Sequence, residues 1–495
     1  MSQAYDLLVI GGGINGAGIA RDAAGRGLRV LLVEKDDLAS HTSSASTKLV
    51  HGGLRYLEHY EFRLVSESLR EREVLLRNAP HIIWPLRFVM PHEPSMRPKW
   101  MLRLGLLLYD RIGGKMSLPR SKRVDLRVAP HRGVLQERLR AGFEYSDCWV
   151  EDARLVVLTV KDAEERGAEV RVGTECTALA RAADGWRATL RDGSGESEVT
   201  ARAVINAAGP FVDRVAKTAL GRSTPAHLRL VKGSHIIVSR RFPGEHAYIF
   251  QQPDGRIVFA IPYERDFTLI GTTDQLYKGD LDDVRIAPEE VTYLCEAASR
   301  YFTSAVSEEE IVSTYAGVRP LYEDNAASNS TVTRDYVFEL EAEGGAPILS
   351  VYGGKITTYR KLAEHALEKL GTVLDLPGAA WTAQAPLPGG DMPDGDFAAF
   401  LWRANERYGW VPPEMLQRLA RAYGTRLDLV LGEANSLADL GRHFGGTLYA
   451  AELRYLVAHE YARTAEDVLW RRSKLGLHLA EDAQQAVVDW FAARD

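Results

Sequence analysis

The chain has 495 residues, of which 45% are hydrophobic, and its formal net charge is −6. This length allows roughly two to four domains with a large core, and this composition excludes a largely disordered chain. The acidic balance gives no sign of a nucleic-acid-binding protein, and three widely spaced cysteines without a CxxC pair argue against a metal cluster or a disulfide framework.

The chain begins with a strand, a glycine-rich turn, a helix and a second strand. Residues 5–10 are an apolar run typical of a buried parallel strand, and residues 14–27 follow with helical spacing and small residues on one side. Residues 29–33 form the second strand, which Glu34 closes. Together these elements predict a complete βαβ unit.

Further along the chain, the pattern changes from alternating helices and strands to consecutive strands. Before residue 210 we expect helices at 66–77 and 153–166 and strands at 169–172, 186–190 and 203–206. Between residues 229 and 273, short strands separated by Pro, Gly and Asp predict an antiparallel sheet. A helix follows at 361–370, and the Pro-, Gly- and Asp-rich segment 387–396 is interpreted as a linker to a helical C-terminal domain.

The turn GGGING at residues 11–16 fits the GxGxxG pattern of dinucleotide-binding proteins. The pattern alone is weak, but here it follows a strand, opens a helix and precedes an acidic residue, Glu34, at the end of the next strand. Its glycines allow the backbone to approach a pyrophosphate at the helix N-terminus, and Glu34 is expected to accept hydrogen bonds from the adenosine ribose.

Two later segments favour FAD over NAD as the cofactor. VINAAGP, at residues 204–210, resembles the second nucleotide-contact motif of the glutathione-reductase-like flavoproteins. The glycine pair of GGKIT, at residues 353–357, is placed to bring backbone N–H groups to a flavin ring. NAD-dependent dehydrogenases do not need these late contacts.

A hydroxyl-rich segment lies between these motifs. TSSASTK, at residues 42–48, suits phosphate and flavin contacts, and LVHGGLRY, at residues 49–56, places His51 and Arg55 beside a glycine pair. The cofactor-binding residues that we expect are Gly11, Gly13, Asn15, Gly16, Glu34, Lys35, Thr42, Ser43, Ser44, Ser46, Thr47, Ala208, Gly209, Gly354, Lys355 and Thr357. No metal ligands are predicted.

Several long motifs resemble the bacterial aerobic glycerol-3-phosphate dehydrogenase family. They include SSASTKLVHGGLRYLEHYEFRLV, FEYSDCWVEDARLV, LVKGSHIIV, IGTTD, GVRPL, TRDY and GGKITTYRKLAEHALEKL, and the resemblance covers nearly the whole chain. It implies oxidation of sn-glycerol 3-phosphate to dihydroxyacetone phosphate with FAD, and transfer of the electrons to a membrane quinone. The enzyme is then expected at the cytoplasmic, inner face of the cell membrane.

The chemistry of this substrate selects candidate residues. A phosphate close to −2 in charge favours several cationic donors, above all Arg. The substrate-binding candidates are Arg55, Tyr56, Arg319, Arg334 and Lys355.

Oxidation also requires a base near the substrate hydroxyl, and His51 and His235 both remain candidates for that base. We therefore expect His51, His235, Arg319 and Lys355 to be the catalytic group. Nearby Lys232 either holds charge near the flavin or is solvated.

The membrane contact is expected to be peripheral. The N-terminus lacks a basic segment followed by an apolar one, so we expect no signal peptide, and no apolar run reaches the roughly 18 residues of a spanning helix. Residues 97–127 contain nine Lys or Arg and two Asp, and residues 100–109 are apolar with aromatic ends. This profile predicts a helix on an anionic lipid surface at residues 97–109, although a core helix with a basic flank remains an alternative.

The predicted fold is α/β, with a glutathione-reductase-like FAD-binding Rossmann domain, an antiparallel-sheet substrate domain and a helical C-terminal domain. The FAD-binding domain is assigned to residues 1–80, 145–215 and 310–386, the substrate domain to 81–144 and 216–309, and the C-terminal domain to 391–495. The last of these offers a second surface for membrane docking or for a homodimer.

Three other functions remain open. A glycerol-3-phosphate oxidase would use the same half-reaction but pass the electrons to O₂ and release hydrogen peroxide. An amino-acid oxidase would bind a carboxylate, which needs fewer cations than this chain offers. A non-catalytic flavin-binding protein would retain FAD without reducing it.

Overall fold

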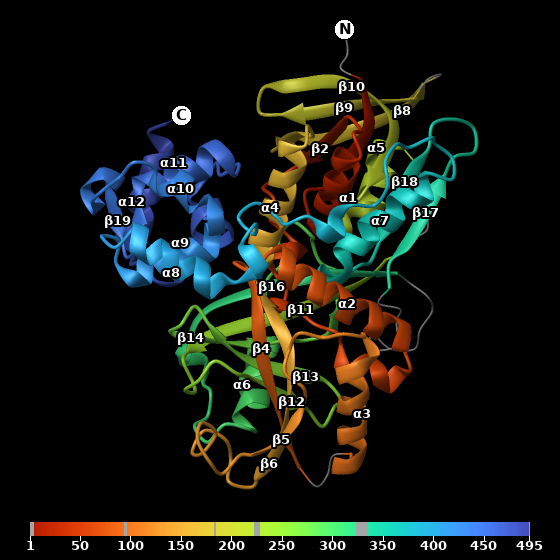
Figure 1. Cartoon of the computed structure of the whole chain (residues 1–495). Helices are drawn as coiled ribbons and strands as arrows, with labels where there is room; N and C mark the ends of the chain where they lie inside the picture. The colour runs from red at the N-terminus through yellow and green to blue at the C-terminus, as the bar shows by residue number, and fades with distance from the viewer. Residues whose placement is uncertain (1–3, 94–96, 183–184, 222–227, 323–334, 495) are drawn as a thin grey trace.

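The computed structural model describes residues 4–93, 97–182, 185–221, 228–322 and 335–494. One β-sheet lies above a second in Figure 1, and the C-terminal helices form a separate lobe to the left. The predicted α/β fold with a helical C-terminal domain is confirmed. Among the described residues, no helix is both long and apolar enough to span a bilayer.

The upper sheet has eight strands, with the order β17-β18-β10-β1-β2-β7 and with β8 and β9 paired beside β10. Neighbours among β7, β2, β1, β10 and β18 run parallel. The strands are β1 (Ala4–Ile10), β2 (Val30–Glu34), β7 (Glu169–Val172), β8 (Glu175–Ala182), β9 (Gly185–Asp192), β10 (Gly195–Asn206), β17 (Val337–Glu341) and β18 (Ile348–Tyr352).

Helices cover one face of this sheet, and the opposite face packs on a hairpin and a short helix. Leu7 and Val9 join the cluster beneath α1 (Ile14–Gly25), α4 (Asp152–Glu165) and α7 (Tyr359–Leu370). Leu8 and Ile10 point the other way, toward β8, β9 and α5 (Val212–Ala219). Because both faces are buried, the strands are continuous apolar runs, which is why the sequence predicts them well.

The lower sheet has ten strands, with the order β15-β11-β14-β13-β12-β4-β6-β3, β16 paired with β11 and β5 paired with β6. The predicted antiparallel strands between residues 229 and 273 are confirmed within it. The strands are β3 (Leu49–Val50), β4 (Ile83–His92), β5 (Lys122–Asp125), β6 (Ala141–Val150), β11 (Leu228–Ser239), β12 (Ala247–Gln251), β13 (Ile257–Tyr263), β14 (Phe267–Gly271), β15 (Gln275–Leu276) and β16 (Ile311–Tyr322).

Alternate residues of β11 show how this sheet is covered on both faces. Ile236 and Val238 pack in the cluster of α6 (Pro288–Ser299), whereas Ile237 belongs to the cluster of α2 (Phe62–Asn78) and α3 (Lys99–Ile112). Successive strand side chains point to opposite faces, so a single strand serves both clusters.

Two strands that the sequence assigned wholly or partly to the FAD-binding domain belong to the lower sheet. β6 and β16 pair with strands of the lower sheet, although the division proposed above assigns residues from 145 and from 310 to the FAD-binding domain. An apolar run indicates a strand but not its hydrogen-bonding partner, and this difference arises from tertiary pairing. The result is that β16 carries its residues from the lower sheet toward the upper one.

The C-terminal lobe has its own hydrophobic core and a well-packed connection to the rest of the chain. In segment 387–396, Leu387 and Gly389 are buried, and the Leu387 N–H donates to the Asn78 carbonyl at 2.8 Å. The elements of the lobe are α8 (Phe397–Arg407), α9 (Pro413–Tyr423), α10 (Leu427–Leu431), β19 (His443–Gly445), β20 (Leu448–Tyr449), α11 (Ala450–His459), a π-helical turn (Asp467–Arg472) and α12 (Glu481–Ala492).

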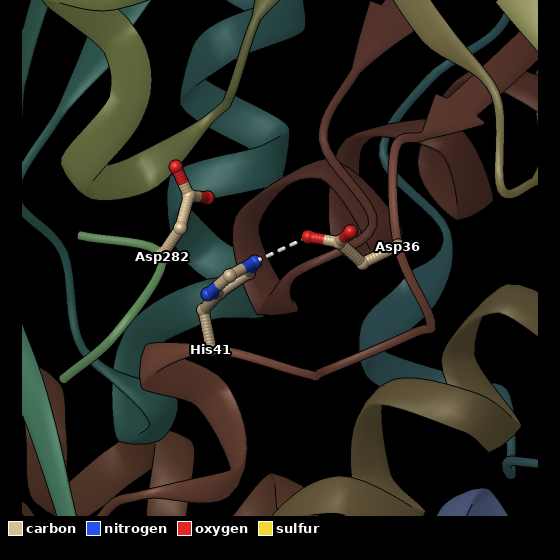
Figure 2. Close-up of side chains that lie close together, drawn as sticks. All are labelled: Asp36, His41 and Asp282. Atoms are coloured by element: carbon tan, nitrogen blue, oxygen red, sulfur yellow. Dashed lines mark hydrogen bonds and ion pairs between the residues drawn. The ribbon is translucent and has the colours of Figure 1, made fainter. Parts of the chain in front are cut away.

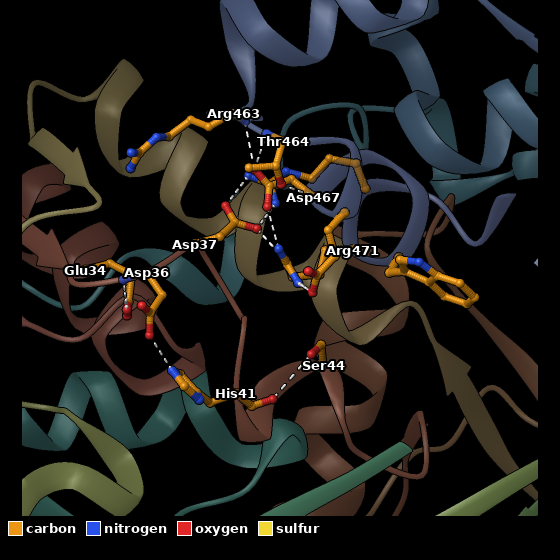
Figure 3. Close-up of polar contacts among 12 residues, drawn as sticks. Glu34, Asp36, Asp37, His41, Ser44, Arg463, Thr464, Asp467 and Arg471 are labelled. Carbon is orange, nitrogen blue, oxygen red and sulfur yellow. Dashed lines mark hydrogen bonds and ion pairs between the residues drawn. The ribbon is translucent and has the colours of Figure 1, made fainter. Parts of the chain in front are cut away.

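Buried ion pairs attach this lobe to the upper domain. Arg154 of α4 donates to Glu460 through both terminal nitrogens, one of them at 2.9 Å. Arg472 donates to Asp37 at 2.7 Å, and Arg471 donates to the same carboxylate at 2.5 Å. Figure 3 shows the loop with Asp36 and Asp37 facing the segment with Asp467 and Arg471.

We expect Arg154→Met to lower the free energy of unfolding by about 3–5 kcal/mol, because it leaves the Glu460 carboxylate buried without its partner. Arg426→Met is the matched control, since Arg426 pairs with Glu165 at 2.6 Å between the same two domains in a partly exposed position. It should cost only about 0–1 kcal/mol. Urea unfolding followed by circular dichroism measures both, and equal losses would contradict the account.

Candidate functional site

A cavity of about 360 Å³ lies where the two sheets meet, and we refer to it as the central cavity. Its walls are formed by the ends of β1, β2 and β10, by part of β16 and by segments 39–51 and 353–357. The predicted site residues that line it are Gly11, Gly13, Asn15, Glu34, Lys35, Thr42, Ser43, Ser46, Thr47, His51, Tyr56, Ala208, Gly209, His235, Arg319, Gly354, Lys355 and Thr357.

The glycine turn at residues 11–16 has no room for side chains. Gly11 has a φ of +113°, and a Cβ on Gly16 would lie 2.0 Å from the Gly11 carbonyl oxygen. Gly13 precedes α1 without a side-chain cap, and the Ile14 N–H donates to Ser43 Oγ at 3.0 Å. The turn therefore presents the N-terminus of a helix to the cavity, an arrangement that favours an anionic group.

Glu34 closes β2 at the edge of the central cavity. Its Oε2 accepts a hydrogen bond from the Gly12 N–H at 2.7 Å, and its Oε1 accepts one from the Asp36 N–H at 2.9 Å. Burial raises the pKa of this carboxyl. Because each carboxylate oxygen has two lone pairs, Glu34 keeps acceptor positions for a ribose hydroxyl.

The hydroxyl-rich segment is only partly directed at the central cavity. Thr42 and Ser43 line it, whereas Ser44 lies on another cavity, called here the rear cavity, whose lining includes Trp470 and Leu477. Residues Thr42–Ser44 form a 3₁₀ turn, in which successive side chains point in different directions. The prediction that Ser44 contacts the cofactor therefore does not match its position.

His235 is the most enclosed of the candidate catalytic residues, with a side chain only 1% exposed. Its Nε2 lies 3.0 Å from Thr47 Oγ1, its ring stacks on Tyr315, and its Nδ1 has no hydrogen-bond partner among the described residues. Burial, together with the nearby charges of Lys48 and Arg319, lowers the pKa of His235 to about 3. This ring is therefore neutral at pH 7 and can accept a proton.

Cationic groups gather at the same end of the cavity. Lys355 Nζ lies 4.3 Å from the centre of the Tyr56 ring. Arg319 Nη2 donates to the Thr273 carbonyl at 3.1 Å and to Asp274 Oδ1 at 3.3 Å, contacts that fix the guanidinium. The backbone N–H of His51 donates to Thr357 Oγ1 at 3.2 Å.

Arg55 lines a smaller cavity of about 130 Å³ beside the central cavity, and we call it the side cavity. Arg319 and Tyr56 line both cavities, so Arg55 adjoins the cationic end of the central one. Arg334, also predicted to bind substrate, lies outside the described residues.

Other residues on these walls were not assigned a role from the sequence. Thr272 lines both cavities, and Arg256 lines the side cavity. The IGTTD motif was the available signal for Thr272, whereas no motif marks Arg256. Lys232, in contrast, is buried against Glu290 at 2.7 Å and its Nζ donates to the Arg285 carbonyl, so the expectation of a solvated side chain is wrong.

Asp36, His41 and Asp282 lie close enough together to suggest metal ligands (Figure 2). Their charges already have protein partners. Lys35 Nζ lies 2.6 Å from Asp36 and 2.7 Å from Asp282, and Arg214 pairs with Asp282 at 2.5 Å. A hydrogen bond from His41 also holds the pKa of Asp36 well below its usual range. We interpret the cluster as an ion-pair network beside the central cavity.

Comparisons with known proteins agree with this geometry. Residues 6–360 match the family of FAD dependent oxidoreductases, and residues 380–494 match the C-terminal domain of alpha-glycerophosphate oxidase. A glycerol-3-phosphate dehydrogenase from Pseudomonas aeruginosa is 53% identical, over 98% of this chain and 94% of its own. A D-erythritol 1-phosphate dehydrogenase from Brucella abortus is 50% identical, over 99% and 98%.

A solved structure is similar over nearly the whole chain. The glycerol-3-phosphate dehydrogenase from Bacillus halodurans, complexed with FAD, superposes with a TM-score of 0.80 at 30% identity. The alignment covers 99% of this chain and 90% of that one. The cofactor of this chain is therefore FAD.

We expect Gly16→Ala to abolish FAD retention, because the new methyl group would displace the Gly11 carbonyl that shapes the turn. Gly105→Ala is the matched control, since a Cβ there meets open space on a helix and should stabilise it by about 1 kcal/mol. The flavin-to-protein ratio after gel filtration measures the outcome. A fully flavinated Gly16→Ala protein would contradict the role of this turn.

Proposed function

Because the chain belongs to the FAD-dependent glycerol-3-phosphate dehydrogenase family, we propose that it oxidises sn-glycerol 3-phosphate to dihydroxyacetone phosphate and passes the electrons to a membrane quinone. The observation that carries the proposal is the arrangement of the central cavity. A glycine turn suited to a dinucleotide lines it, together with His235, Arg319 and Lys355.

The cavity residues fit FAD. The glycine turn and the N-terminus of α1 would hold the pyrophosphate, Glu34 the ribose, and segments 42–47 and 353–357 the flavin end. The side-chain amide of Asn15 donates to the Gly353 carbonyl at 3.0 Å. This hydrogen bond connects the glycine turn to segment 353–357. FAD, when bound, accepts the hydride from the substrate carbon.

Three cations serve the phosphate of the substrate. Arg319 and Lys355 line the central cavity, and Arg55 lines the side cavity, which shares wall residues with it. A dianionic phosphate near Arg side chains gains charge-assisted hydrogen bonds, and fixed donors lose little entropy on binding. Substrate held in this way places its secondary hydroxyl near a base.

His51 and His235 both remain candidates for that base. His235 lines the central cavity, its buried Nδ1 has no hydrogen-bond partner among the described residues, and its ring is neutral around pH 7. The lowered pKa of His235 makes it a weaker proton acceptor than an ordinary histidine. His51 therefore remains a candidate for the base. Bound phosphate would oppose the effect of Lys48 and Arg319 and raise the pKa of His235.

A second candidate substrate is D-erythritol 1-phosphate, because a relative with that name is 50% identical over almost the full chain. It also combines secondary alcohols with a phosphate. A second candidate acceptor is O₂, because the C-terminal residues match a domain named after an oxidase. Peroxide formed at the rate of substrate loss would identify an oxidase.

α3 supports the proposed membrane contact. Trp100, Leu104 and Leu107 are 67%, 58% and 38% exposed, whereas Leu106 and Tyr109 are buried against the lower domain. Exposed Arg97 and Lys99 begin the segment. An apolar stripe with a basic end matches an anionic lipid surface, and we place the enzyme at the cytoplasmic face of the membrane.

We expect Arg319→Met and Arg55→Met each to lower kcat/KM for glycerol 3-phosphate by roughly 10- to 150-fold, the loss of one charge-assisted hydrogen bond of about 1.5–3 kcal/mol. FAD should stay bound. Arg191→Met is the matched control, because the Arg191 side chain of β9 is exposed, and it should leave both activities unchanged. Glycerol should be a poor substrate of the wild type and lose much less in the variants, and equal losses for both substrates would show that these arginines do not bind the phosphate.

We expect the double variant Leu104→Asp, Leu107→Asp to leave anionic vesicles while still reducing its FAD with glycerol 3-phosphate. Burial of these side chains in the lipid boundary supplies the salt-resistant part of binding. Leu429→Asp with Val488→Asp is the matched control, because these side chains are similarly exposed on the C-terminal lobe. Co-sedimentation with anionic vesicles measures the binding of both double variants. If the Leu429→Asp, Val488→Asp variant leaves the vesicles and the α3 variant does not, the membrane contact belongs to the C-terminal lobe.

A further inference from the structure

A segment without helix or strand connects β15 to α6, and we call its residues 277–287 the strap. Both of its ends belong to the lower domain, because β15 pairs with β11 and α6 packs in the hydrophobic cluster of the same sheet. In the middle of the strap, Asp282 contacts the upper domain. Its Oδ1 lies 2.7 Å from Lys35 Nζ, and its Oδ2 lies 2.5 Å from Arg214 Nη1. These ion pairs connect the two domains.

The partners of Asp282 lie at an opening of the central cavity. Lys35 directly follows Glu34, and both Lys35 and Arg214 line the cavity. Their side chains are 29% and 44% exposed, so they also reach the solvent. Thr218, one turn after Arg214 on α5, is likewise exposed and lines the cavity. Residues that line a cavity and also face the solvent mark its opening, and the strap is bound to this one.

An aromatic side chain lies at the same opening. The buried ring of Phe211 lines the central cavity, with Lys35 Nζ 4.6 Å and Arg214 Cζ 4.8 Å from its centre. Figure 2 shows Asp282 beside Asp36 and His41, which belong to the loop after β2. Asp282 thus holds both cations that contact Phe211.

The strap is held firmly near α6 and weakly at Asp282. Near α6, the buried Lys232 pairs with Glu290 and donates to the Arg285 carbonyl at 2.9 Å. The Asp282 side chain, in contrast, is 42% exposed. Ion pairs in such positions contribute little to stability and weaken with salt. A segment with exposed contacts and no regular hydrogen bonding opens more easily than the core beside it. We therefore expect the strap to open at Asp282.

We propose that the strap controls the exchange of FAD, which enters and leaves the central cavity beside α5 when the ion pairs of Asp282 with Lys35 and Arg214 open. The glycine turn and Glu34 would hold the nucleotide half of FAD at this end of the cavity, so the strap lies on the path of that half. The inference goes beyond the proposed function, because it concerns retention of the cofactor and not the reaction.

Two other roles of Asp282 give different expectations. If Asp282 only neutralises Lys35 and Arg214, its removal frees two cations for the pyrophosphate, and FAD leaves more slowly. If Asp282 is only part of the binding wall, its removal lowers the affinity for FAD. A segment that must open for both entry and exit changes the two rates by the same factor and leaves the affinity unchanged.

The test measures exchange of the bound cofactor in the holoenzyme against an excess of isotopically labelled FAD. No substrate is present, so the result does not depend on oxidation of glycerol 3-phosphate. We expect Asp282→Asn to accelerate exchange roughly fivefold at low salt, because two partly exposed ion pairs are lost. The fraction of FAD that stays bound at equilibrium after dilution should equal that of the wild type.

Salt provides a second readout. Raising NaCl from about 0.05 M to about 0.5 M should bring exchange in the wild type close to the rate of Asp282→Asn, because the same ion pairs are screened. The variant should respond much less.

Asp283→Asn is the matched control, because Asp283 is an exposed strap residue that pairs with Arg285 of the strap itself at 2.6 Å. It should leave the exchange rate unchanged. Asp282→Glu retains the carboxylate and should exchange FAD at nearly the wild-type rate.

Three results would overturn the inference. Exchange that is unchanged or slower in Asp282→Asn would show that the strap does not limit release of FAD. Faster exchange with an equal loss of affinity would make Asp282 part of the binding wall. Equal acceleration by Asp283→Asn would show that the effect does not depend on the contacts with the upper domain.

Discussion

The parallel pairing of β1 with β2 and β10, and of β10 with β18, is the constraint on which the site depends. It brings the carboxyl ends of four strands to one edge, where a doubly wound sheet binds its ligand. Segments that are hundreds of residues apart meet there, and the hydrogen bond from Asn15 to Gly353 is a direct sign of it. The lower sheet then adds His235 and Arg319 from β11 and β16.

The chain is acidic overall, with a net charge of −6, but the cationic side chains of Arg319 and Lys355 line the central cavity. Nη2 of Arg319 donates to Asp274 Oδ1 and to the Thr273 carbonyl, contacts that orient the guanidinium on the cavity wall. Lys48, in contrast, is buried with Asp152 at 2.8 Å and stays structural. The cations near the cavity thus differ in place: Arg319 lines the central cavity, whereas Lys48 lies in a buried ion pair.

The sequence predicted the elements and motifs of the upper domain, because buried parallel strands and a glycine turn have strong local patterns. It also predicted a helix at residues 97–109, and Trp100, Leu104 and Leu107 of α3 are exposed. It could not place Ser44 on the rear cavity, Arg256 on the side cavity or β16 in the lower sheet. These positions follow from tertiary pairing and from the direction of single side chains in a 3₁₀ turn, and neither leaves a periodic signal.

The central claim is that this cavity couples a phosphorylated secondary alcohol to FAD. The most direct measurement is an anaerobic titration of the purified holoenzyme with glycerol 3-phosphate, in which visible flavin absorbance and dihydroxyacetone phosphate are measured together. The account predicts that the absorbance bleaches in step with an equimolar amount of ketone, whereas the same concentration of glycerol leaves it unchanged. A flavin that stays oxidised with glycerol 3-phosphate, or that bleaches equally with glycerol, would contradict it.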